Sequence, residues 1–183
     1  MIEIPFLAGE TIFTLIWLIV RLVVWTRNSR IDWRREGLLL LMYINLAVLI
    51  RITFFPMTLI DGNVQPLIFD PATAYPFRIN LVPFVRLNDY VNKQDMILNC
   101  IGNISMFIPS GIILPIVYKH LNNFWKVVGV GVLISLGIEI LQLPFSVRAS
   151  DIDDLIMNIT GVIIGYGIYL LAQKVRQQIK SKT

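Results

Sequence analysis

Four charged residues stand together near the end of the chain, at the start of the stretch RASDIDDLIMNITGVIIGY, residues 148–166. Arg148 is followed by Asp151, Asp153 and Asp154, and the rest of the stretch carries no charge. Carboxylate oxygens are the ligands that Mg²⁺ and Ca²⁺ prefer, and an arginine can hold a phosphate through two parallel hydrogen bonds. The stretch therefore predicts a site for a divalent cation or for a charged ligand at the start of an apolar helix.

The same residues also have a purely structural interpretation. Ser150 followed by Asp153 fits the capping box of a helix start, and the helix dipole stabilises aspartates in a first turn. Arg148 beside them can form a surface ion pair, which contributes little to stability. Capping and ligand binding are therefore alternatives for each single aspartate.

Other polar residues recur at a similar depth in other apolar segments. With a rise of 1.5 Å per residue, Asn99 and Asn103 lie roughly 6 and 12 Å inside their segment. A charged residue costs about 2.5 to 3.5 kcal/mol at the centre of a membrane-spanning helix, so several such residues together indicate an inward-facing polar pocket. The predicted members of this pocket are Asn80, Asn99, Asn103, Glu139, Gln142, Arg148, Asp151, Asp153, Asp154, Asn158 and Arg51.

Within the pocket, Glu139 is the residue hardest to explain structurally, because it lies too deep to cap a helix. Glu139 and Asp153 are the candidate catalytic residues, and the candidate ligands of a possible divalent cation are Asp151, Asp153 and Asp154. The same side of the chain has no serine-histidine, cysteine-histidine or zinc-ligand arrangement, which excludes a conventional hydrolase triad. The chain has one cysteine, so no intrachain disulfide can form.

The composition predicts where such a pocket lies. Of the 183 residues, 56% are hydrophobic and 15% are charged, and the mean hydropathy is +0.69. Soluble domains do not have this composition, whereas segments that cross a hydrocarbon core of roughly 30 Å do. The net charge of +4 is explained by the lysines and arginines of cytoplasmic loops, so we expect no nucleic-acid binding.

The predicted fold is all-α, a polytopic membrane bundle of about five transmembrane helices in a single domain over residues 1–183. The predicted spans are residues 6–25, 37–55, 96–118, 124–145 and 154–172. The first span has no small-residue cleavage signature after it, so we interpret it as retained, with Arg21 reaching to the interface. The connection over residues 56–95 is rich in proline and aromatic residues, and we predict a re-entrant or lid-like outer loop.

The basic residues predict the orientation of the chain. One side of the predicted bundle carries ten of them: Arg27, Arg30, Arg34, Arg35, Lys119, Lys126, Lys174, Arg176, Lys180 and Lys182. The other side carries four, and it also carries seven loop aspartates. Because lysine and arginine concentrate in cytoplasmic loops, the N-terminus is predicted to lie outside and the C-terminus in the cytoplasm.

Small residues and a short repeat predict helix contacts. Small residues four apart let membrane helices approach closely, and the candidates are Gly102, Gly111, Gly161 and Gly165. The segments DMILNCIG (residues 95–102) and DLIMNITG (residues 154–161) share the spacing Asp-x3-Asn-x2-Gly, which places the three residues on one helical face. This predicts a weak internal repeat, in which the asparagines are either pocket residues or interhelical hydrogen-bond partners.

Four blocks of sequence resemble, in order, the signature blocks of the VanZ-like family of bacterial membrane proteins. They are NLVPF (residues 80–84), NCIGNISMFIPSGIILP (99–115), EILQ (139–142) and RASDIDDLIMNITGVIIG (148–165). The resemblance implies a location in the bacterial cell membrane. It also implies an association with low-level resistance to teicoplanin, a lipid-tailed glycopeptide antibiotic that acts on peptidoglycan precursors at the outer membrane surface.

Two functions are compatible with these observations. In the first, the pocket binds a membrane lipid, a lipid-linked cell-wall precursor or the lipoglycopeptide itself. In the alternative, the chain is a membrane enzyme that modifies a lipid-linked envelope substrate with its carboxylates or a bound cation. Transport is disfavoured, because the inner halves of the spans are apolar and five spans lack the paired inverted repeats usual in transporters.

Overall fold

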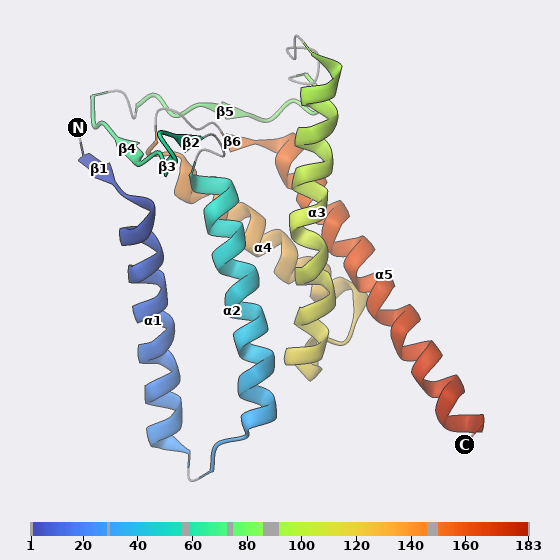
Figure 1. Cartoon of the computed structure of the whole chain (residues 1–183). Helices are drawn as coiled ribbons and strands as arrows, with labels where there is room; N and C mark the ends of the chain where they lie inside the picture. The colour runs from blue at the N-terminus through green and yellow to red at the C-terminus, as the bar shows by residue number, and fades with distance from the viewer. Residues whose placement is uncertain are drawn as a thin grey trace. The chain divides into compact units, whose positions relative to one another are not determined.

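The computed structural model of the chain describes residues 2–28, 30–55, 59–72, 75–85, 92–145 and 150–182. Within these ranges the long helices are α1 (Phe6–Arg27), α2 (Trp33–Phe54), α3 (Lys93–Val117), α4 (Phe124–Gln142) and α5 (Ile152–Lys182) (Figure 1). All five are long and apolar enough to cross a membrane. The predicted all-α fold with five spans is confirmed.

The helix bounds differ from the predicted ones for local reasons. α2 begins earlier than predicted because the side chain of Asp32 caps it, accepting the backbone N–H of Arg34 at 3.0 Å. α4 ends at Gln142, before the predicted residue 145, because the residue preceding Pro144 disfavours the helical conformation. α5 runs past the predicted residue 172 to Lys182, since its last turns contain neither glycine nor proline.

The connection between α2 and α3 contains short strands that were not predicted from the sequence. β2 (Leu59–Ile60) and β3 (Asn63–Val64) form an antiparallel hairpin. Its turn residues Asp61 and Gly62 have φ of 51° and 75°, as a two-residue hairpin turn of this kind requires. β4 (Leu67–Phe69) pairs antiparallel with β1 (Ile2–Ile4), so the connection is tied to the residues that precede α1.

The contacts divide the chain into two compact units. The first consists of Met1–Ile79 and Leu141–Ala149, and the second of Asn80–Ile140 and Ser150–Thr183. The division falls inside the single transmembrane domain that the sequence predicts over residues 1–183.

In the first unit, α1 and α2 form an antiparallel helical hairpin (Figure 1). The Arg21 guanidinium donates to both carboxylate oxygens of Glu36, with 2.8 Å between Nε and Oε2. Higher in the hairpin, the ring of Tyr43 contacts Phe13 and Trp17. Arg21 is buried because the first turn of α2 brings a carboxylate within its reach; that it reaches to the interface stays a prediction.

In the second unit, α3 and α5 lie side by side and run in the same direction (Figure 1). A Cβ added to Gly161 would lie 2.1 Å from the backbone oxygen of Ile104, and one added to Gly111 would lie 2.2 Å from that of Val162. Gly165 is equally close to α3. The predicted glycine contacts are confirmed here, but Gly102 is not one of them, because an added Cβ there would meet nothing within 4 Å.

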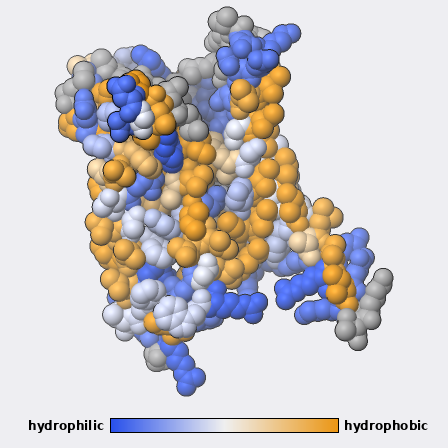
Figure 2. Space-filling view, in the orientation of Figure 1, coloured by the Kyte–Doolittle hydropathy of each residue, from blue (hydrophilic) through white to orange (hydrophobic). Residues whose placement is uncertain are grey.

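The surface of the helices is that of a membrane protein. Figure 2 shows hydrophobic residues along the visible sides of the helices and hydrophilic residues gathered toward helix ends. Many of the large apolar side chains are exposed, including Leu7, Leu133 and Leu171. A soluble protein rarely exposes so much contiguous apolar surface, whereas lipid solvates it. The chain is therefore a multi-pass membrane protein.

Candidate functional site

Polar residues of the second unit converge where α5 begins. The strand β6 (Ser150–Asp151) directly precedes α5 and pairs with β5 (Ile79–Asn80). The Asn80 Nδ2 donates to Asp151 Oδ1 at 3.0 Å, across 71 residues of sequence. The backbone N–H of Asp151 donates to Glu139 Oε2, in the last turn of α4, at 3.1 Å. Asp151 therefore joins three elements of the unit.

Asp151 also caps α5. Its Oδ1 accepts the backbone N–H of Asp153 at 3.0 Å, which is the hydrogen bond that an N-cap side chain makes. The predicted capping box beginning at Ser150 is therefore wrong by one residue, because the helix begins at Ile152. The Asp151 side chain is buried while it makes this bond.

Asp153 holds the segment that follows β5. Its Oδ1 accepts the backbone N–H of Phe84 at 2.7 Å. Phe84 has φ of 65°, a left-handed conformation that is unusual for a bulky residue and persists only where its surroundings stabilise it. The segment from Asn80 to Phe84 is thus fixed at both ends by aspartates, at Asn80 by Asp151 and at Phe84 by Asp153.

Two further hydrogen bonds tie α5 to its neighbours. Asn103 Nδ2, on α3, donates to Asp154 Oδ1 at 2.6 Å. Deeper in the unit, Asn158 Nδ2 donates to Ser135 Oγ, on α4, at 2.9 Å, and both side chains are buried. Ser135 is not among the predicted pocket residues, although it lies one helical turn before Glu139 and therefore on the same face of α4.

We call these residues together the acidic cluster: Asn80, Asn103, Ser135, Glu139, Asp151, Asp153, Asp154 and Asn158. Glu139 and Asp153 are 5% and 4% exposed. In the part of the chain that the structure describes, neither carboxylate forms an ion pair. The acidic cluster therefore combines buried carboxyl groups with a framework of directed hydrogen bonds.

Two buried oxygens of the acidic cluster have no hydrogen-bond partner among the described residues. They are Asp153 Oδ2 and Asn158 Oδ1, and Asn158 is only 2% exposed. Leaving a buried polar atom unsatisfied costs about 1 to 3 kcal/mol, and such atoms are few in folded proteins. The oxygens of an ionised carboxylate and of an amide are acceptors, so a hydrogen-bond donor would satisfy both atoms.

The candidate ligands of the predicted cation, Asp151, Asp153 and Asp154, all lie in the acidic cluster. Across residues 2–182 with the gaps given above, no three His, Cys, Asp or Glu side chains are placed to hold a metal ion. The carboxylates are directed to different partners: Asp151 to Asn80, Asp153 to Phe84 and Asp154 to Asn103. Each of these three carboxylates therefore holds a neighbouring segment by a hydrogen bond, and the divalent cation stays a prediction.

Several predicted pocket residues are not part of the acidic cluster. Asn99 is exposed on α3. Gln142 belongs to the first unit, where its Nε2 donates to the backbone oxygen of Thr53 at 2.6 Å. Arg51 lies over the ring of Phe6, with its Cζ 5.3 Å from the ring centroid. Arg148 lies outside the described residues.

Comparison with known proteins returns related sequences but no related structure. The family model described as VanZ/LLP1 matches residues 39–173, a range that contains every member of the acidic cluster. The chain is similar to Protein VanZ of Enterococcus faecium, with 35% identity over 102 residues, 56% of this chain and 58% of the relative. The match thus spans less than two thirds of that relative's length. No solved structure matches the chain.

Proposed function

Because the chain belongs to the VanZ/LLP1 family, we propose that it lowers the action of teicoplanin by binding a lipid-linked ligand at the acidic cluster. The observation that carries the proposal is the pair of buried acceptors without a partner, Asp153 Oδ2 and Asn158 Oδ1. Costly polar groups within the spans of membrane proteins mark functional sites. The proposed ligand is a membrane lipid, a lipid-linked cell-wall precursor or the lipoglycopeptide itself.

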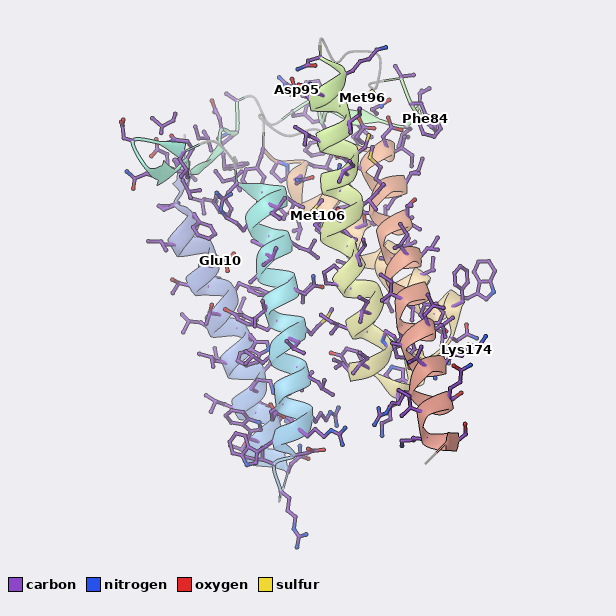
Figure 3. All side chains as sticks on the ribbon, turned by 45° about the vertical axis from the view of Figure 1, so that its right-hand side comes forward. Glu10, Phe84, Asp95, Met96, Met106 and Lys174 are labelled. Atoms are coloured by element: carbon purple, nitrogen blue, oxygen red, sulfur yellow. The ribbon has the colours of Figure 1, made fainter. Side chains whose placement is uncertain are left out.

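The proposed orientation has the N-terminus outside and the C-terminus in the cytoplasm. In the second unit, Figure 3 places Phe84 and Asp95 at one end and Lys174 near the other end of α5. The basic end should face the cytoplasm. The acidic cluster then faces the outer leaflet, where a lipid-linked precursor or a lipid-tailed antibiotic is met.

The carboxylates also support a second function, the modification of a lipid-linked envelope substrate. The candidate catalytic residues Glu139 and Asp153 are both buried; the Glu139 carboxylate accepts the backbone N–H of Asp151, whose own carboxylate accepts the backbone N–H of Asp153. Carboxyl groups in such a position can transfer protons. Binding is the simpler function, because it needs only the open acceptors, whereas catalysis also needs a reacting group.

Expression in a teicoplanin-susceptible bacterium tests the proposal. The unaltered chain should raise the inhibitory concentration of teicoplanin more than that of vancomycin, because only teicoplanin carries a lipid tail. Asp153→Asn and Glu139→Gln keep the size of each side chain and should abolish the effect at unchanged membrane abundance. Asp95→Asn is the matched control, since Asp95 is exposed in the first turn of α3 and is not a member of the acidic cluster (Figure 3).

Four outcomes separate the possibilities. Full protection by both cluster variants, or equal protection against both antibiotics, would contradict the proposal. Mass spectrometry of lipids and cell-wall precursors from cells with and without the chain distinguishes the two functions. A new or missing lipid species that depends on Glu139 would establish the enzyme, and unchanged species together with protection would establish binding.

A further inference from the structure

The open atoms of the acidic cluster identify the chemistry of its ligand, an inference that rests on the proposed function. Asp153 Oδ2 and Asn158 Oδ1 are hydrogen-bond acceptors, and neither has a partner among the described residues. An ionised phosphate or carboxylate has no donor to offer and would add negative charge beside the carboxylates of the cluster. The group that enters must donate hydrogen bonds.

Charge distinguishes between the possible donors. Asp153 is a carboxylate, 4% exposed, and no described lysine, arginine or histidine forms an ion pair with it. An ionised carboxylate that is buried without a partner is destabilising, so a cation gains more from this position than a neutral hydroxyl does. Hydrogen bonds from a charged donor to a carboxylate are also shorter and stronger than neutral ones. A protonated primary amine supplies both the charge and the N–H donors.

The surroundings indicate that the amine is carried by an amphiphile. The segment from Asn80 to Phe84 is fixed to the cluster by its two ends, while the side chains of Leu81, Val82 and Phe84 are exposed. Apolar side chains therefore stand directly beside the buried carboxylates. A molecule with a polar head and a hydrocarbon chain can contact both at once.

We propose that the acidic cluster binds the protonated primary amine of a lipid headgroup, with an N–H of the amine donating to Asp153 Oδ2. The hydrocarbon part of the same molecule lies against the exposed side chains of residues 81–84. A quaternary ammonium headgroup has the same charge but no N–H, so it binds more weakly.

The test compares headgroups of the same charge in which methyl groups replace the N–H donors one by one. The full chain is purified in detergent and titrated with short-chain phosphatidylethanolamine, its N-methyl and N,N-dimethyl forms, and phosphatidylcholine of the same acyl length. Affinity should fall along this series, by about tenfold between its ends, the ratio expected for a hydrogen bond to a charged group. Because the series needs no substitution, it is independent of any effect of a variant on folding.

Two variants and a soluble compound locate the contact. Asp153→Asn should remove the preference for phosphatidylethanolamine, and Asp95→Asn should keep it. Phosphoethanolamine, which has the amine without the chains, should bind far more weakly than the lipid. If phosphoethanolamine bound as tightly as the lipid, the inference that the ligand is an amphiphile would be overturned, and the ligand would be a free amine.

Different results would overturn the amine inference and the proposed function. If all headgroups bind the unaltered chain equally and Asp153→Asn abolishes binding of every one, the amine inference is overturned and the proposed function stands. If binding is equal and neither Asp153→Asn nor Glu139→Gln changes it, both are overturned.

Discussion

Asp151 combines two roles that the sequence presents as alternatives. Its Oδ1 accepts from the backbone N–H of Asp153, as a helix cap does, and also from the side chain of Asn80. Its own N–H donates to Glu139. Asn80 and Glu139 are far from Asp151 in sequence, so no local pattern could reveal that a cap also organises the cluster. For Asp151, capping and assembly of the cluster are one function.

The buried pair of Asn158 and Ser135 leads to a prediction on stability. Asn158→Ala should lower the free energy of unfolding by about 0.5 to 2 kcal/mol, since interhelical hydrogen bonds in membranes have this value. Ser135→Ala should cost a similar amount. The double variant should cost less than the sum of the two, by about 0.6 kcal/mol.

Reversible unfolding in mixed detergent micelles measures these values. Thr160→Ala is the control, because its hydroxyl donates within its own helix, to the backbone oxygen of Ile156. Strictly additive costs of the two cluster substitutions would show that the hydrogen bond of 2.9 Å contributes nothing to stability.

The contact between α3 and α5 depends on glycines that leave room for a neighbouring backbone. Gly161→Ala should destabilise the chain by about 1 to 3 kcal/mol, the usual cost of overpacking, because the new methyl group would meet the oxygen of Ile104. Gly167→Ala, in the same helix, should be neutral or stabilising by up to about 1 kcal/mol, since nothing lies within 4 Å of its added Cβ. Unfolding under the same conditions compares the two. Similar effects would mean that the close approach does not stabilise the pair.

The two copies of the repeat show what helical spacing predicts and what it leaves out. In α5, Asn158 is buried and Gly161 contacts α3. In α3, the equivalent Asn99 is exposed and Gly102 contacts nothing. Spacing predicts correctly that the residues share a face, but it cannot tell which face is buried. The partner of Asp154 is Asn103, one turn further along α3, so the start of α3 extends beyond the start of α5.

Hydropathy predicts the five spans because a segment's length and apolar composition are enough to tell whether it can cross the hydrocarbon core. It also predicts most of the acidic cluster, since polar residues are costly in a span wherever they stand. Two kinds of feature escape it. Strands of two or three residues carry too little pattern to be detected, and the partners of Arg21 and Phe84 depend on elements that meet only in the folded chain.

The proposed orientation predicts which parts of the chain reagents in the medium can reach. In a chain with Cys100→Ser, a cysteine replacing Tyr75 should react with a membrane-impermeant thiol reagent in intact cells. A cysteine replacing Asn28, in the connection between α1 and α2, should react only after the cells are permeabilised. Both native residues are exposed, so burial does not limit the reaction. The reverse pattern would place the N-terminus in the cytoplasm and the acidic cluster at the inner leaflet.

The buried ion pair between α1 and α2 has a consequence for biosynthesis. The ribosome produces Arg21 first, and its partner Glu36 follows only 15 residues later. Until then, the translocon holds a first span whose arginine has no carboxylate to contact, which disfavours release of α1 into lipid by itself. We therefore expect release to follow the emergence of the start of α2, when the two charges can meet. The ion pair thus predicts that the first two helices enter the bilayer together.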